Sequence, residues 1–168
     1  MNPLPHRYTV RLAGNATGHA TLAADGLPEL RTAPPREFDG PGDAWSPEHL
    51  LLAAVQTCFL FTLRGVARAS GIELFKCEVE AEGTVDRTDR VTRFTEIVLR
   101  TRLLLAREVD RTRARRAVEK AEHACLISAS LATPVRLELE LRESESTAQE
   151  TDLTPRISKT LGHSTQAA

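Results

Sequence analysis

Apolar residues dominate one long segment of the chain, from Leu50 to Leu63, and helix-boundary signals flank it. Ser46 suits the N-cap of a helix, because its hydroxyl can accept from a free amide of the first turn. Pro47 suits the first helical position and Gly71 the residue that follows the last turn. The apolar run is shorter than the ~20 residues that cross a bilayer. The pattern therefore predicts a central helix, apolar around most of its axis and buried in a core.

The region before this helix reads as a small sheet and a stiff loop. Weak alternation of apolar and polar positions, with turn signals at Gly14 and Gly26, predicts a small antiparallel sheet over residues 7–32. Residues 33–45 are rich in proline and glycine, which keep them out of a regular helix or a central strand. Such a loop can position side chains beside the helix that follows.

The region after the helix shows clearer alternation, which is the pattern of β-strands. Strands are predicted over residues 75–82, 94–105 and 135–141, with the polar stretch 86–90 joining the first two. In the first of these strands Cys77 shares the apolar face with Phe75 and Val79. Cys77 is therefore expected to pack in the core.

A second helix is predicted from about Arg111, with Asp110 as its cap. One apolar stripe runs along it at helical spacing and consists of Ala114, Ala117, Val118, Ala121 and Cys125. The stripe places Cys125 toward the core at the C-terminal end of this helix. The order of the elements predicts an α+β fold, with antiparallel sheets around a long buried central helix.

The composition fits a single domain over residues 1–142, followed by a polar segment, residues 143–168, that we expect to be a flexible tail. A net charge of −1 leaves no basic surplus for nucleic acid or an anionic membrane, so neither is expected as a partner. A small molecule or a second copy of the chain is the expected partner. The N-terminus does not resemble a secretory signal, which favours a cytoplasmic protein.

Cys58 and Cys125 are the residues best suited to chemistry. Each alone is most simply an inert buried thiol, because free cysteine is among the most buried residue types. Two cysteines on core-facing helices could also reach the ~4.4 to 6.8 Å Cα separation of a disulfide. A thiol of pKa near 8.5 is only about 3% ionised at pH 7, and a decrease of two units requires roughly 2.7 kcal/mol. A reactive Cys58 therefore calls for a nearby cation.

Glu48 could hold that cation as the carboxylate partner of an arginine, or it could simply complement the positive end of the helix. On one straight helix Glu48 and Cys58 are separated by about 15 Å. Direct contact within one chain is then improbable. Either an arginine bridges from Glu48 to Cys58 over a long reach, or the site combines Glu48 of one subunit with Cys58 of another across a two-fold interface. The almost wholly apolar central helix favours the second arrangement, because one chain has few other elements to cover it.

Two segments resemble motifs of a known family. The segment from Trp45 to Phe59, WSPEHLLLAAVQTCF, resembles the signature of the OsmC/Ohr family of osmotically inducible and organic hydroperoxide resistance proteins. The segment from Ala124 to Ser128, ACLIS, is similar to the family's second cysteine motif, and the resemblance covers about residues 8–142. It implies an intertwined homodimer with two interface sites, and a thiol peroxidase activity without metal or bound cofactor.

The resemblance also implies roles for individual residues. Cys58 becomes the peroxidatic nucleophile, Cys125 the resolving cysteine, and Glu48 the carboxylate that orients an activating arginine. The expected function is a cysteine-based reductase of organic hydroperoxides. The Cys58 thiolate forms a sulfenic acid, Cys125 converts it to a disulfide, and an external dithiol restores both thiols.

The chain departs from the family at the arginine. The stretch Ala16–His19 lacks the arginine of the Ohr branch, whereas Arg36 occupies a loop position like that of the OsmC branch. Arg36 is the leading candidate, and Arg11 and Arg31 are weaker ones. Leu126 stands where many relatives have proline, which is a second and smaller departure.

Two other functions compete with the peroxidase. In the first, the missing arginine leaves Cys58 protonated, and an inactive OsmC-like dimer binds an apolar small molecule at the subunit interface. In the second, His123, Cys125 and Cys58 bind a metal. The metal site is disfavoured, because His123 and Cys125 two positions apart on one helix lie on different faces.

Overall fold

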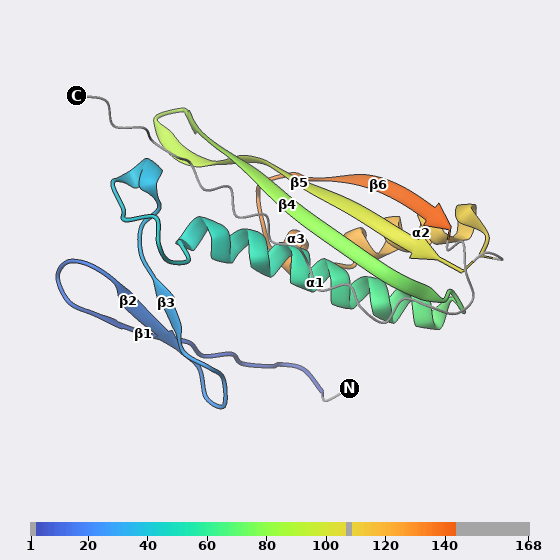
Figure 1. Ribbon diagram of the computed structural model, residues 1–168, viewed down its shortest axis with the longest axis horizontal. Helices are drawn as coiled ribbons and strands as arrows, with labels where there is room; N and C mark the ends of the chain where they lie inside the picture. The colour runs from blue at the N-terminus through green and yellow to red at the C-terminus, as the bar shows by residue number, and fades with distance from the viewer. Residues whose placement is uncertain (1–2, 107–108, 144–168) are drawn as a thin grey trace, which may run out of the picture.

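The computed structural model describes residues 3–106 and 109–143, and these form two sheets and a set of helices (Figure 1). The first sheet is antiparallel and contains β1 (Arg11–Gly14), β2 (Ala20–Ala23) and β3 (Leu30–Thr32) in that order. A short 3-10 helix, η1 (Arg36–Phe38), interrupts the loop that follows. Figure 1 shows the first sheet set apart from the second, toward the N-terminal end of α1 (Pro47–Ala69). The predicted N-terminal sheet is confirmed.

The second sheet contains three longer strands, β4 (Leu74–Thr88), β5 (Val91–Leu105) and β6 (Val135–Glu143), in that order. β4 and β5 form an antiparallel hairpin whose two turn residues, Asp89 and Arg90, have φ values of 53° and 65°. β6 pairs with β5 in parallel, so the expectation of purely antiparallel sheets is wrong for this strand. The polar stretch 86–90 is mostly strand rather than loop, which carries the hairpin beyond its predicted end.

The start of β4 contains a second difference from prediction. The register of the hairpin shifts between Leu74 and Lys76, and this irregularity removes Phe75 from the alternation. The Phe75 side chain is 52% exposed, whereas Leu74 packs against the core. The prediction that Phe75 shares the core face with Cys77 is therefore wrong, because a β-bulge resets which side chains point inward.

Helix α1 begins and ends where its sequence signals place it. The Ser46 hydroxyl accepts from the His49 amide at 3.3 Å, and Gly71 adopts a φ of 63° after the last turn. By length and composition α1 could cross a membrane, with a mean hydropathy of 1.7. Its buried residues nevertheless form a stripe that belongs to a protein core: Val55, Phe59, Leu63 and Ala67. Within one chain α1 is buried along this one stripe, not on nearly all sides as predicted.

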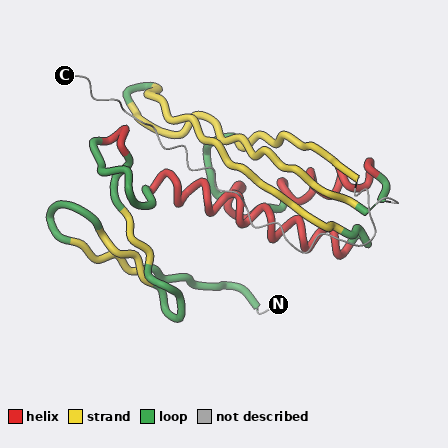
Figure 2. The backbone as a smooth tube through the Cα atoms, viewed as in Figure 1, coloured by secondary structure: helices red, strands yellow, loops and turns green. Residues whose placement is uncertain are grey.

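Two further helices complete the layer against the second sheet (Figure 2). They are α2 (Arg111–His123) and the single turn α3 (Leu126–Ala129). Asp110 caps α2 as predicted, because its carboxylate accepts from the Thr112 amide at 2.8 Å. The core lies between the helices and the sheet, where side chains of α1 and α2 pack on Ile97, Leu99, Leu103 and Leu105 of β5.

The opposite face of the second sheet is polar. Arg100 on β5 pairs with Glu82 on β4 at 2.5 Å and with Glu138 on β6 at 3.1 Å. These side chains are partly exposed, so this face of the sheet is solvated and is not part of a core. Exposed ion pairs of this kind contribute little to stability. β6 ends at Glu143, and the remainder of the predicted tail lies outside the described residues.

Candidate thiol site

Cys58 lies in the middle of α1 and is half-buried against the core cluster that contains Cys125. Cys125 is 0% exposed, and its thiol lies within hydrogen-bonding reach of the Cys58 sulfur. The structure thus brings together the two cysteines that the sequence pairs. It places Cys125 differently from the prediction, however, because α2 ends at His123 and Cys125 is the N-cap of α3.

The start of α3 supplies the donors around Cys58. The first amides of a helix have no acceptor within that helix, and here those of Leu126 and Ile127 point to the Cys58 sulfur. Burial raises the pKa of Cys58, but these two amides, the Cys125 thiol and the Thr62 hydroxyl lower it more. The net effect is a Cys58 pKa below its ordinary value, which favours the thiolate.

Cys125 has the opposite character. Burial raises its pKa, the hydroxyl and amide of Ser128 lower it, and the neighbouring Cys58 sulfur raises it again. The net effect is a Cys125 pKa above its ordinary value. The pair therefore favours one protonation pattern, in which Cys125 keeps its proton and donates it in a hydrogen bond to a Cys58 thiolate.

The main donors to Cys58 in this chain are amides, a thiol and a hydroxyl, and not the cation that we expected from the sequence. Arg11 pairs with Asp25, and Arg31 pairs with Asp43 at 3.0 Å, both on or beside the first sheet. Arg36 is exposed on η1. It lies against Gly42 so closely that a Cβ added there would be 2.3 Å from the Arg36 Nε. The role of Arg36 as the activating arginine stays a prediction.

Glu48 lies in the first turn of α1, far from Cys58 of the same chain. The helix is continuous between them, so the separation of about 15 Å applies. The Glu48 Oε2 is buried and has no hydrogen-bond partner among the residues that the structure describes. A buried acceptor without a donor costs about 1–3 kcal/mol. One chain therefore leaves this end of the site incomplete.

A cavity of about 600 Å³ opens beside Glu48. Phe38 of η1, Leu52 of α1 and Phe94 of β5 form apolar parts of its wall, and Arg87 of β4 adds a cation. Gly83 of β4 makes room for this wall, because a Cβ there would be 2.5 Å from the Phe94 ring. The volume falls in the range of small-molecule sites, roughly 300 to 1,000 Å³.

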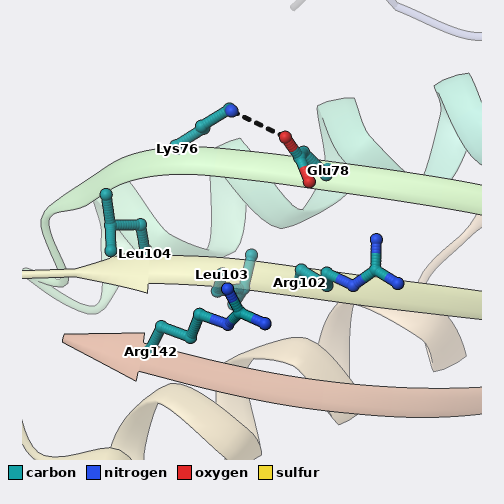
Figure 3. A pocket seen from close by; sticks show the side chains of 6 residues that line it. All are labelled: Lys76, Glu78, Arg102, Leu103, Leu104 and Arg142. Atoms are coloured by element: carbon teal, nitrogen blue, oxygen red, sulfur yellow. Dashed lines mark ion pairs between the residues drawn. The ribbon is translucent and has the colours of Figure 1, made fainter. Parts of the chain in front are cut away.

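A second hollow of about 180 Å³ lies on the polar face of the second sheet (Figure 3). Its charged side chains already have partners: Lys76 pairs with Glu78 at 2.6 Å, and Arg142 with Glu140 at 2.7 Å. It lies across the sheet from the core that holds the thiols. This hollow is therefore a solvated surface feature and not part of the candidate site.

His123 and Cys77, the remaining candidate residues, each have contacts that are separate from the Cys58–Cys125 pair. The His123 side chain is 83% exposed, and its Nδ1 lies 2.8 Å from the Glu119 carbonyl oxygen, at the end of α2. Residues 3–106 and 109–143 contain no cluster of three or more His, Cys, Asp or Glu side chains suited to a metal. Cys77 packs against the core as predicted, and burial raises the pKa of its thiol to about 11.

Sequence reasoning missed two groups that the structure adds. The amides of Leu126 and Ile127 were missed because the spacing of the apolar residues extends the stripe of α2 to Cys125, whereas the helix ends at His123. A non-proline residue at position 126 was the available signal, because only such a residue carries an amide hydrogen. Arg87 was assigned to a connecting loop, whereas it belongs to β4.

The fold agrees with the comparisons to known proteins. The family model described as OsmC-like protein matches residues 40–140, so this chain belongs to the OsmC-like family. The uncharacterized protein YmaD of Bacillus subtilis (strain 168) is 36% identical over 109 residues, which are 63% of this chain and 73% of YmaD. The α+β fold with two sheets and a central helix is the OsmC-like fold, as predicted.

Solved structures agree with this assignment. An OsmC-like protein of unknown function from Vibrio cholerae is 16% identical, with a TM-score of 0.75 over 81% of this chain and 100% of that chain. An organic hydroperoxide resistance protein from Legionella pneumophila is 26% identical, with a TM-score of 0.66 over 83% of this chain and 98% of that chain. The family is thus associated with peroxide reduction.

Proposed function

We propose that this protein reduces organic hydroperoxides to alcohols, with Cys58 as the peroxidatic cysteine and Cys125 as the resolving cysteine. The observation that carries the proposal is the opposite perturbation of the two thiols. Donors from α3 lower the pKa of Cys58, whereas the pKa of Cys125 is raised. A nucleophile that ionises first, beside a thiol that keeps its proton, is what this chemistry requires.

The reaction proceeds in three balanced steps. The Cys58 thiolate attacks the distal oxygen of the hydroperoxide, the O–O bond breaks, and the alkoxide takes a proton and leaves as the alcohol. The resulting Cys58 sulfenic acid condenses with the Cys125 thiol to form a disulfide and release water. An external dithiol then reduces the disulfide by exchange and becomes oxidised. No metal or bound cofactor is needed, and a reducing cytoplasm would supply the dithiol.

The complete site is proposed to form in a homodimer. Along α1, Phe61 is 62% exposed in the single chain, and Tyr8 on the N-terminal segment is 87% exposed. Burying such apolar surface is the main favourable term in association. The partner would bring Glu48 and Arg36 of one subunit toward Cys58 of the other, with Glu48 orienting the Arg36 guanidinium.

A second function has support from the cavity beside Glu48. A volume of about 600 Å³ with an apolar wall is sufficient for a small molecule without any reaction. In that case the protein is an inactive dimer that binds an apolar ligand at the subunit interface. The lowered pKa of Cys58 favours the peroxidase, because simple binding gives no reason for an ionised thiol.

Intact-mass analysis separates the two functions. The Cys125→Ser variant receives one equivalent of cumene hydroperoxide, and the peroxidase predicts a gain of one oxygen that maps to Cys58. The unsubstituted chain should instead lose two hydrogens as the disulfide forms. A Cys125→Ser protein that keeps its mass, while cumene hydroperoxide remains unconsumed, would favour the binding protein.

A further inference from the structure

The carboxylate of Glu48 has room for a second charged partner besides the arginine of the proposed function. A carboxylate has two oxygens and can accept from two separate donors. Its Oε2 is buried and makes no hydrogen bond within residues 3–106 and 109–143, although Glu48 lines a cavity that also contains a cation. One arginine on this carboxylate, as in the proposed function, leaves an acceptor free for another.

Among the described residues, Arg87 is the arginine that lines this cavity. On β4, Val79, Ala81 and Gly83 face the core and α1, and beyond the register shift between Thr84 and Val85 the strand continues along the cavity, where Val85, Asp86 and Arg87 line its wall. The strand thus carries Arg87 past the end of the core and over the first turn of α1.

Arg87 has no competing ion pair within the described part of the chain. Its own amide bonds to the Asp86 carboxylate at 2.6 Å, but that contact engages the backbone and not the guanidinium. Arg11, Arg31 and Arg100 are already paired with carboxylates elsewhere. The Arg87 guanidinium is therefore available to a carboxylate across the cavity.

We propose that Arg87 is a positioning residue, whose guanidinium pairs with the Glu48 Oε2 and holds the carboxylate in place for Arg36. In the single chain the two groups line the same cavity, and among the described residues no hydrogen bond reaches the Glu48 Oε2. Covering the cavity, by substrate or by a second copy of the chain, removes the water that solvates both charges and makes their pairing favourable. The role in turnover rests on the proposed function, but the pairing itself does not.

The cavity chemistry favours this role over binding an anionic ligand. Glu37, Glu48 and Asp86 all line the cavity, so Arg87 stands among three carboxylates. The three carboxylates would repel an anionic substrate more than Arg87 attracts it. An ion pair between Arg87 and one of these carboxylates is favourable instead, because it joins opposite charges that already line the cavity. Glu37 is exposed on η1 and serves as a control carboxylate.

A double-mutant cycle in urea unfolding tests the pairing in the assembled protein, at one fixed protein concentration. The cycle compares the unsubstituted chain with Arg87→Gln, Glu48→Gln and the double variant. Arg87→Gln should lower the unfolding midpoint when Glu48 is present and have little effect in the Glu48→Gln background. Equal effects in both backgrounds, or coupling of Arg87 to Glu37 in the matching cycle with Glu37→Gln, would overturn the proposal.

The same variants test the role in turnover with cumene hydroperoxide. Arg87→Gln should lower kcat/KM roughly tenfold, as the loss of one charge-assisted bond in the site implies, and Arg87→Lys should restore part of it. Arg93→Gln is the matched control, because Arg93 lies opposite Asp86 in the hairpin, is exposed and does not line the cavity.

The two proposals fail in different ways. If the unsubstituted protein turns over no hydroperoxide, the proposed function fails, while the unfolding cycle still decides whether Arg87 and Glu48 pair. If the unsubstituted protein is active and Arg87→Gln matches Arg93→Gln in kcat/KM, the positioning role is overturned and the peroxidase stands.

Discussion

The two candidate regions of α1 are completed to different degrees within one chain. Around Cys58, a buried thiol and the first amides of α3 surround the sulfur and lower its pKa. Around Glu48, a carboxylate oxygen is buried beside a large cavity and has no partner in the described part of the chain. The difference shows that thiol activation can come from local backbone geometry, whereas the carboxylate depends on charges that other elements must bring to it.

The largest effect is expected from replacing the thiol of Cys58, around which the single chain already supplies the donors. Cys58→Ser should reduce hydroperoxide turnover to the background rate, because a serine hydroxyl does not ionise near neutral pH and cannot form the sulfenic acid. Steady-state consumption of cumene hydroperoxide with excess dithiol measures it. Cys77→Ser is the matched control and should remain active. Turnover by Cys58→Ser at the unsubstituted rate would rule out Cys58 as the nucleophile.

A smaller effect on turnover is expected from removing the charge of Glu48, whose surroundings one chain leaves incomplete. Glu48→Gln keeps the size of the side chain but removes its charge, and should lower kcat/KM by about 10- to 100-fold, as the loss of a charge-assisted hydrogen bond worth about 1.5–3 kcal/mol implies. Because the donors to Cys58 come from α3, its thiol pKa should change less than kcat/KM. A Glu48→Gln protein with normal kcat/KM would show that Glu48 only complements the helix dipole.

The contribution of α3 to the low pKa of Cys58 can be measured by removing one backbone amide hydrogen. Leu126→Pro removes the amide donor at the first position of α3, where proline fits a helix well. The pKa of Cys58 should rise measurably, because one of the hydrogen bonds to the thiolate is lost while the other donors remain. Leu126→Ala keeps the amide and should leave this pKa unchanged. The same pKa in both variants would contradict the role of the amide.

The smallest effect on function is expected at Cys77. Burial raises its pKa in the folded protein to about 11, above the ordinary thiol value of about 8.5. Well below that ordinary value the thiol is protonated in both the folded and the unfolded state. Between about pH 8.5 and pH 11 it ionises mainly in the unfolded chain, so this contribution to stability is lost as pH rises. Cys77→Ala should unfold with a shallower decline over that window in urea titrations. An unchanged decline would mean that other groups cause it.

Much of the fold could be predicted because its signals are local. Ser46 and Pro47 mark the start of α1, and alternation marks the strands, since each pattern depends on neighbours in the chain. The bulge that exposes Phe75 and the parallel pairing of β6 depend on contacts between distant strands. Periodicity carries no information on either.

The candidate site divides in the same way. Cys58, Cys125 and Glu48 could be selected from residue type and motif. The donors from Leu126 and Ile127 could not, because they are backbone groups that become free only where α3 begins. Arg87 was also missed, since its place beside Glu48 depends on how far the hairpin extends past the core.

The central claim is that a single chain lowers the pKa of Cys58 through its own fold. The most direct test is to measure the rate of Cys58 alkylation as a function of pH in the reduced, unsubstituted protein. Mass spectrometry of the peptide that contains Cys58 reports the extent of alkylation. The account predicts a midpoint below the ordinary thiol value of about 8.5. A midpoint at or above that value would mean that α1 merely buries the thiol, and it would contradict the account.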